Sequence, residues 1–112
     1  MGQIETVNPA TDQVIAEYEQ MDAETVFQKI EAAHKAFLVW RSKSHTERAD
    51  FLREIAAALR DNATDLAELM TKETGKLIRD GKTEIELSAQ IFEYTAEQGP
   101  DMLADEERKH SG

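Results

Sequence analysis

The 112-residue sequence contains no cysteine. Disulfide bonds, thiolate metal sites and a cysteine nucleophile are therefore excluded within these residues, and a reducing compartment fits the composition. Long apolar runs are missing too, because no stretch approaches the roughly 20 apolar residues that a membrane-spanning helix needs. The opening residues MGQIETVNPA show no basic segment followed by an apolar one, which a signal peptide would have. We therefore expect a cytoplasmic protein.

Positive charge is also scarce. The chain has 13 Lys and Arg against 23 Asp and Glu, which gives a net charge of −10 and a pI near 4.7. Such a surface repels the phosphate backbone of nucleic acids and the anionic headgroups of membranes. We expect neither nucleic acid nor a membrane as a partner.

Aromatic residues make up only 6% of the chain, and there are two prolines and five glycines. With 40% hydrophobic and 32% charged residues, the composition is that of a folded protein rather than a disordered one. The core must rest on Leu, Ile, Ala and Met. The length suffices for one small domain, residues 1–112.

Residues 4–19 predict a β-hairpin. The runs IETV and QVIAEYE are rich in β-branched and apolar residues, and they flank the turn-forming stretch NPATD. Pro9 disfavours helix at Asn8, and Asp12 tolerates a turn conformation. A lone two-stranded hairpin is marginally stable, so we expect this one to pack against another part of the fold.

Residues 22–98 predict amphipathic helices, because apolar residues recur at spacings of three and four. Asp22 should cap the first helix, which ends near Ser42, and Ser44 with Glu47 should form a capping box on the second. The predicted apolar faces comprise Val26, Ile30, Ala33, Phe37 and Trp40; Ala49, Leu52, Ile55, Ala56 and Leu59; Leu66, Leu69 and Met70; and Ile85, Ser88, Ala89, Phe92 and Ala96.

The remaining helix boundaries follow from single residues. Asn62 is predicted to cap the third helix, and Gly75 to end it in a left-handed conformation. The fourth helix should begin at Leu77 or Thr83 and stop at Gln98, because Gly99 and Pro100 follow. A charged tail, residues 99–112, completes a mostly α fold in the order ββαααα.

No group of residues predicts catalysis. The histidines are too far apart in sequence to pair on a helix face as a metal site requires, the carboxylates resemble solvated helix faces, and the arginines spread around their helix. These residues are His34, His45 and His110; Glu84, Glu86, Asp105, Glu106 and Glu107; and Arg48, Arg53 and Arg60. We therefore predict no catalytic residue in this chain.

The stretch KETGKL does not predict a phosphate loop. A P-loop needs a glycine at the position of Met70, Ser or Thr at the position of Leu77, and a preceding strand, whereas a helix is predicted here. No Rossmann glycine fingerprint occurs either. We predict no cofactor-binding residue in this chain.

Taken in order, several motifs resemble the start of an aldehyde dehydrogenase. They are the NPxTG-type hairpin, the Ala-rich helix with Phe37, Trp40 and Arg41, the following R…L…A..L helix, the E-x-G-K signature at Glu73, Gly75 and Lys76, and the ending EYTAE. The resemblance covers residues 4–107 and is nearest to bacterial succinate-semialdehyde dehydrogenases. Asp12 replaces the usual glycine, and Leu77 replaces a frequent proline.

The resemblance implies the helical layer of a larger α/β enzyme that oxidises an aldehyde to the acid with NAD or NADP. Family members are about four times longer, and their Rossmann, catalytic and oligomerisation parts have no counterpart here. The chain alone is therefore expected to be an inactive N-terminal fragment. The family's structural cation, where present, would fall at Val7 and Glu84, although an ordinary surface glutamate is the simpler interpretation.

Two further interpretations stay open from the sequence. One is a free-standing helical domain that acts in interaction or assembly without catalysis. The other concerns partners, since the apolar helix faces need cover either from the missing remainder of the enzyme or from self-association.

Overall fold

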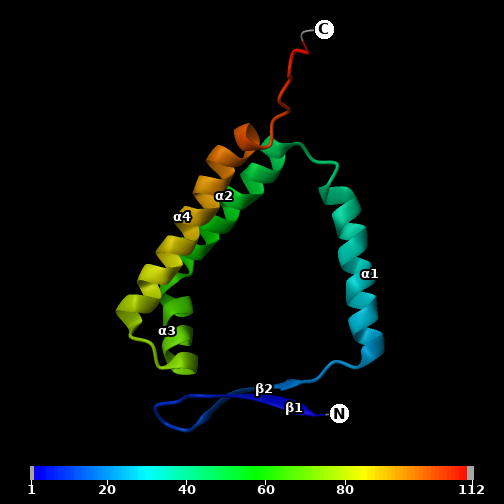
Figure 1. The fold of residues 1–112 in the computed structure, drawn as a ribbon. Coiled ribbons are helices and arrows are strands. Elements are labelled where there is room, and N and C mark those ends of the chain that lie inside the picture. Colours follow the sequence, from blue (N-terminus) through cyan, green and yellow to red (C-terminus); the bar gives the residue numbers. More distant parts are fainter. Residues whose placement is uncertain (1, 111–112) are drawn as a thin grey trace.

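The computed structural model describes residues 2–110 and has the predicted order of two strands followed by four helices (Figure 1). The fold class is confirmed: the chain is mostly α with an N-terminal hairpin. The elements are β1 (Gln3–Val7), β2 (Val14–Glu19), α1 (Ala23–Trp40), α2 (His45–Asp61), α3 (Ala63–Thr74) and α4 (Ile78–Met102).

Strands β1 and β2 pair in antiparallel register, with Gln3 opposite Glu19 and Thr6 opposite Ala16. The side chain of Asn8 organises the turn, since its Oδ1 accepts a bond from the Ala10 N–H at 2.9 Å. Asp12 has φ 57, so it adopts the left-handed conformation that the usual glycine would supply. Strand β1 of the hairpin contacts α3.

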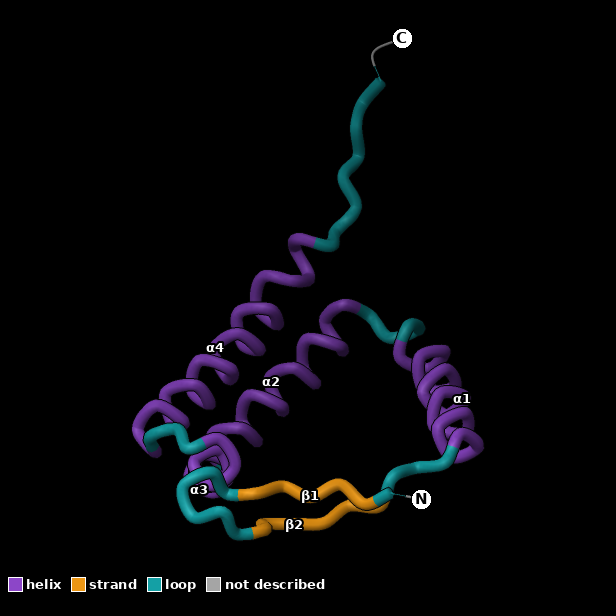
Figure 2. Tube along the Cα trace, turned by 60° about the horizontal axis from the view of Figure 1, so that its bottom comes forward, coloured by secondary structure: helices purple, strands orange, loops and turns teal. Residues whose placement is uncertain are grey.

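Helix α1 begins with the predicted cap, because the Asp22 carboxylate accepts a bond from the Thr25 N–H at 2.8 Å. The helix ends at Trp40 and contains no buried residue. In Figures 1 and 2 it stands apart from the other helices along its length. The apolar face of α1 is therefore not packed against other described residues, although the sequence pattern predicts a packed face.

Helices α2 and α4 form the packed part of the molecule, lying side by side and antiparallel (Figure 2). The predicted capping box at Ser44 and Glu47 is present and fixes the start of α2. Small side chains let the helix backbones approach closely. The buried residues of the core are Ala49, Ala56, Ala67, Ile85, Ala89 and Ala96.

Helix α3 begins directly after α2, with Asn62 at the boundary. The prediction that the Asn62 side chain caps α3 is wrong: its amide instead donates to the Ala58 carbonyl at 2.8 Å. The Asn62 amide therefore bonds a carbonyl in the last turn of α2, and it does not bond an N–H group in the first turn of α3. The left-handed end at Gly75 is confirmed, with φ 74.

Helix α4 starts at Ile78 and passes through Gly99 and Pro100 to Met102, so the prediction that these residues stop it is wrong. A proline lacks the N–H that would bond the carbonyl four residues earlier, here that of Ala96. Arg53 on α2 supplies a substitute donor to that carbonyl at 3.5 Å. Residues 103–110 have no helix or strand, and the end of the predicted tail lies outside the described residues.

The molecule is an open frame rather than a globule. Its radius of gyration is 20.1 Å, whereas a compact chain of this length has about 13 Å. It exposes 9211 Å², compared with about 6,200 Å² for a compact protein of its mass. No described helix is long and apolar enough to cross a membrane.

Candidate functional site

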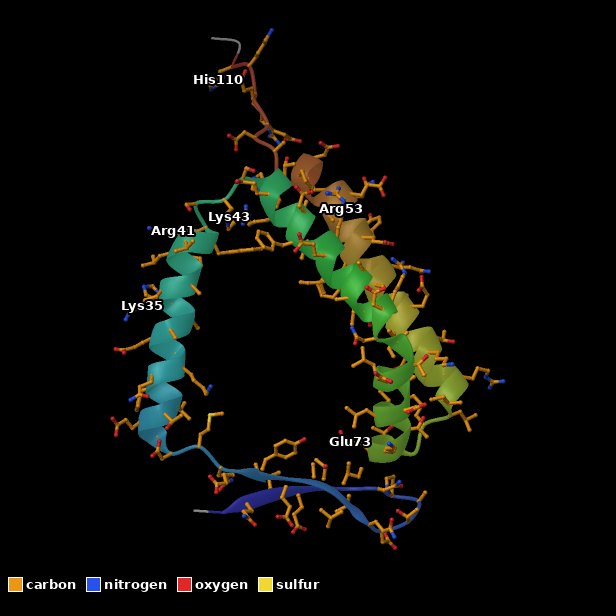
Figure 3. All side chains as sticks on the ribbon, turned by 180° about the vertical axis from the view of Figure 1, so that it is seen from behind. Lys35, Arg41, Lys43, Arg53, Glu73 and His110 are labelled. Carbon is orange, nitrogen blue, oxygen red and sulfur yellow. The ribbon has the colours of Figure 1, made fainter. Side chains whose placement is uncertain are left out.

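The three histidines lie on different parts of the frame. His34 is on α1 against the ring of Phe37, His45 is at the start of α2, and His110 is in the tail, at the far end of the molecule in Figure 3. Within residues 2–110, no three His, Asp or Glu side chains gather closely enough to hold a metal ion. Of the residues singled out in the sequence, the structure brings together His45 with Arg48, whose guanidinium lies 2.6 Å from His45 Nδ1, and Arg60 with Glu86.

Val7 ends strand β1, and Glu84 lies in the second turn of α4. The Glu84 carboxylate forms an ion pair with the ammonium of Lys76. That lysine already supplies a positive charge beside the carboxylate. A structural cation at Val7 and Glu84 stays a prediction from the resemblance.

Gly75 and Lys76 lie in the short connection between the end of α3 at Thr74 and the start of α4 at Ile78. A nucleotide phosphate binds at the N-terminal end of a helix in a glycine-rich turn that follows a strand, whereas a helix precedes this pair. Lys76 is moreover engaged with Glu84. The absence of a cofactor-binding residue in this chain stays a prediction from the sequence.

The strongest electrostatic feature is a clamp in which Arg60 of α2 binds two carboxylates of α4. Its guanidinium donates to Glu86 at 3.0 and 3.1 Å and to Glu93 at 2.8 Å. Hydrogen bonds from Arg60 lower the pKa of Glu86 and of Glu93, and the two carboxylates raise the pKa of Arg60. The clamp fixes the register of α2 against α4, and we assign it no chemistry.

Sequence reasoning missed this clamp: it took Arg60 as a scattered surface charge and Glu86 as part of a solvated helix face, and it did not single out Glu93. The available signal was weak: Glu86 and Glu93 are seven residues apart, so they lie on one face of a helix. Their partner is 26 and 33 residues away in sequence, and only the packing of α2 against α4 shows which arginine binds them.

The largest functional candidate is therefore a surface, and its first part is the α1 face, defined as Val26, Ile30, Phe37 and Trp40. Ile30 is 58% exposed and Phe37 is 50% exposed. The C-terminal end of α1 is anchored by a ring contact, where the centroids of Trp40 and Phe51 of α2 are 5.2 Å apart. Figure 3 shows Arg41 and Lys43 at the corner where α1 joins α2.

The second part is an open apolar groove along the face that α2 and α3 share at their junction, with a volume of about 380 Å³. We call it the α2–α3 groove. Four large apolar side chains and one alanine line it, with polar side chains confined to two positions. The lining residues are Ile55, Ala58, Leu59, Leu66 and Leu69, together with Asn62 and Asp65.

Three buried polar atoms have no hydrogen-bond partner within the described residues: Thr6 Oγ1, Thr71 Oγ1 and Arg48 Nε. Arg48 lines a smaller cavity of about 180 Å³, beneath Trp40. Buried polar groups are usually paired with protein or with ordered water.

Comparison with known proteins identifies relatives of this chain. The family model described as the aldehyde dehydrogenase family matches residues 1–111. A succinate-semialdehyde dehydrogenase [NADP(+)] from Deinococcus radiodurans is 37% identical over 98 residues, which are 88% of this chain and 20% of that protein. A betaine aldehyde dehydrogenase from Vibrio vulnificus is 40% identical over 92 residues, 81% of this chain and 19% of that protein.

The fold agrees with the sequence comparison. The crystal structure of succinic semialdehyde dehydrogenase from Streptococcus pyogenes, in complex with NADP+, matches with a TM-score of 0.86 and 30% identity. The match covers 96% of this chain and 24% of that one. The chain thus spans about a fifth of the length of the curated relatives it matches. From its sequence motifs, its fold and these matches, the chain belongs to the aldehyde dehydrogenase family, as an N-terminal segment.

Proposed function

We propose that this chain is the structural N-terminal segment of an enzyme that oxidises an aldehyde to the carboxylic acid with NAD or NADP. Its own part is to provide a helical framework on which the nucleotide-binding and catalytic parts of the longer enzyme pack. The observation that carries the proposal is the uncovered α1 face, in a chain that spans about a fifth of its relatives.

The exposed area fits this role. The chain exposes roughly 3,000 Å² more than a compact protein of its mass would. Monomeric proteins rarely leave contiguous apolar patches beyond a few hundred Å² uncovered. At about 25 cal/mol per Å² of apolar surface, covering even 1,000 Å² would contribute on the order of 25 kcal/mol before entropic costs. Cover for this surface would therefore stabilise the segment.

The cofactor and the aldehyde are proposed at different levels of detail. The names of two matched proteins specify NADP, which supports a nicotinamide dinucleotide for the enzyme as a whole. The named aldehydes differ between relatives that match equally well, since succinate semialdehyde and betaine aldehyde occur at 37% and 40% identity. Similarity within this segment therefore does not select a substrate, and we propose an aldehyde without naming one.

A chimeric enzyme tests the proposal. The matching segment of the Deinococcus radiodurans enzyme is replaced by that of the present chain, and NADP-dependent oxidation of succinate semialdehyde is measured. We expect kcat/KM within about tenfold of the parent, or about 1.4 kcal/mol in the activation free energy. A soluble, folded chimera without activity would contradict the proposal, as would one that fails to fold.

A pair of substitutions on α1 provides the control within the chimera. Ile30→Asp places a charge on the α1 face and is expected to abolish assembly, because an unpaired buried charge is costly. Gln28→Asp adds the same charge on the opposite side of the same helix and should leave activity unchanged. Equal activity of the two variants would show that the α1 face is not used.

A further inference from the structure

We propose that the cavity beneath Trp40 binds a small aliphatic carboxylate, whose charged end is held by Arg48. This goes beyond the proposed function, because it concerns a ligand of the segment itself and not the packing of the segment against further chain. Three observations carry it: an arginine that no described acid pairs with, an apolar cavity beside that arginine, and a basic corner in a strongly acidic chain.

The first observation is that the charge of Arg48 has no counter-ion in the part of the chain that the structure describes. None of the ion pairs within residues 2–110 includes Arg48. The nearest acids along α2 are engaged elsewhere. The Glu47 carboxylate accepts a bond from the backbone N–H of the N-cap residue at 2.7 Å, and that of Asp50 accepts one from Arg53 at 2.8 Å. The positive charge of Arg48 is therefore available to an anion.

The guanidinium of the half-buried Arg48 is also incompletely hydrogen-bonded. Its Nη2 lies 2.6 Å from His45 Nδ1, whereas its Nε is shut off from water and has no partner among the described residues. A charged group that is withdrawn from water without full pairing is costly. A carboxylate offsets that cost well, because its two oxygens lie in one plane and match the planar donors of arginine.

The second observation is the cavity itself, which supplies room and an apolar wall. Its volume of about 180 Å³ corresponds to about six water-sized groups, at roughly 30 Å³ each. The large apolar residues of its lining are Trp40, Leu52, Pro100 and Leu103. Leu103 is 62% exposed at the end of α4, so a ligand can enter from solvent past this side chain. Such a site fits a molecule with one charged end and a short hydrocarbon body.

The third observation is that the charge around the cavity favours an anion, although the whole chain carries −10. Residues 41–48 hold the cationic residues Arg41, Lys43 and Arg48, and Glu47 is their one acid. Figure 3 shows Arg41 and Lys43 at this corner of the frame. The acidic surface elsewhere repels anions, so an anion binds this chain only where positive charge gathers locally.

The first experiment titrates the 112-residue chain with butyrate, whose carbon chain and carboxylate are of about the cavity's size. Trp40 is the single tryptophan of the chain and lines the cavity, so its fluorescence reports binding directly. We expect a saturable change in emission with a dissociation constant in the millimolar range, as for other ligands this small. Butanol, butylamine and sodium chloride of equal ionic strength should give no saturable change. A silent titration with butyrate, or an equal response to butanol, would overturn the proposal.

Substitution of Arg48 tests its role in the same assay. Arg48→Gln should raise the dissociation constant of butyrate roughly tenfold or more, because a charged hydrogen-bond partner is lost, and Arg48→Lys should raise it less. Arg79→Gln is the matched control, since Arg79 is 80% exposed at the start of α4, whereas the cavity lies at the end of that helix. Unchanged affinity in a folded Arg48→Gln variant would refute the site. If that variant does not fold, the comparison of butyrate with butanol and butylamine still decides.

The second experiment distinguishes a free acid from a carboxylate side chain of the longer enzyme. Butyrate is added to the chimeric enzyme, and transfer of magnetisation from protein to the butyrate methyl group is measured by NMR. We expect a transfer signal that falls with Arg48→Gln and stays with Arg79→Gln. A signal in the chimera that does not depend on Arg48 would mean that the added chain fills the site, which contradicts a free acid. The oxidation of succinate semialdehyde by the chimera is measured separately, so this failure leaves the proposed function standing.

Discussion

Two glycines, Gly75 and Gly99, occupy different places in the helices. Gly75 ends α3 with φ 74, a conformation that costs an L-residue roughly 1–2 kcal/mol. Gly99 lies inside α4, and a Cβ added there would meet no atom within 4 Å. Glycine therefore favours stability at position 75 and lowers it at position 99.

At the residue scale, we predict opposite effects of one substitution at these glycines. Gly75→Ala should lower the free energy of unfolding by about 1 kcal/mol, because alanine is strained at positive φ. Gly99→Ala should raise it by roughly 0.5–1 kcal/mol, because alanine restricts the unfolded chain and suits a helix. Urea unfolding followed by circular dichroism measures both. An unchanged midpoint for Gly75→Ala would refute the left-handed cap.

At the scale of elements, sequence patterns located the helices but not their partners. The caps at Asp22 and Ser44 are local and were predictable, since each bond spans three residues. The end of α4 was not predictable from local sequence. The Ala96 carbonyl, which Pro100 cannot bond, accepts a hydrogen bond from Arg53, and Arg53 is distant in sequence. Likewise, periodicity correctly gave α1 an apolar face but cannot show whether the same chain covers it.

The Arg60 clamp gives a prediction about pH at this scale. Glu86 and Glu93 have pKa values lowered below their ordinary 4.5 by hydrogen bonds from Arg60. Carboxylates with lowered pKa values contribute stability that is fully present above 4.5 and lost as pH falls through the lowered values. Arg60→Gln should therefore destabilise the chain above pH 4.5, with the difference from the wild type vanishing in stronger acid.

Urea midpoints of the wild type and Arg60→Gln across a pH series measure this difference. Arg79→Gln is the control for the removal of an arginine, since its carboxylate partner Asp80 is adjacent to it on the same helix, α4. High salt should shrink the Arg60 effect, because the clamp is exposed to solvent. A difference between wild type and Arg60→Gln that persists unchanged in strong acid would rule out an electrostatic clamp.

At the scale of the whole molecule, the frame is a set of well-formed helices without a common core. Its buried residues are mainly alanines between α2, α3 and α4, whereas the large side chains of α1 remain exposed. The sequence could show that large apolar faces exist and which family has them in this order. It could not show the α2–α3 groove, because that surface depends on how Ile55 and Leu69 are placed by two different helices.

The central claim is that the α1 face is an interface to the remainder of an aldehyde dehydrogenase. Hydrogen exchange of the α1 amides in the chimeric enzyme tests it most directly, because local opening is suppressed where side chains are packed. We predict that α1 amides in the chimera are protected as strongly as those of α2 and α4. Exchange of α1 amides as rapid as that of residues 103–110 in the active chimera would contradict the claim.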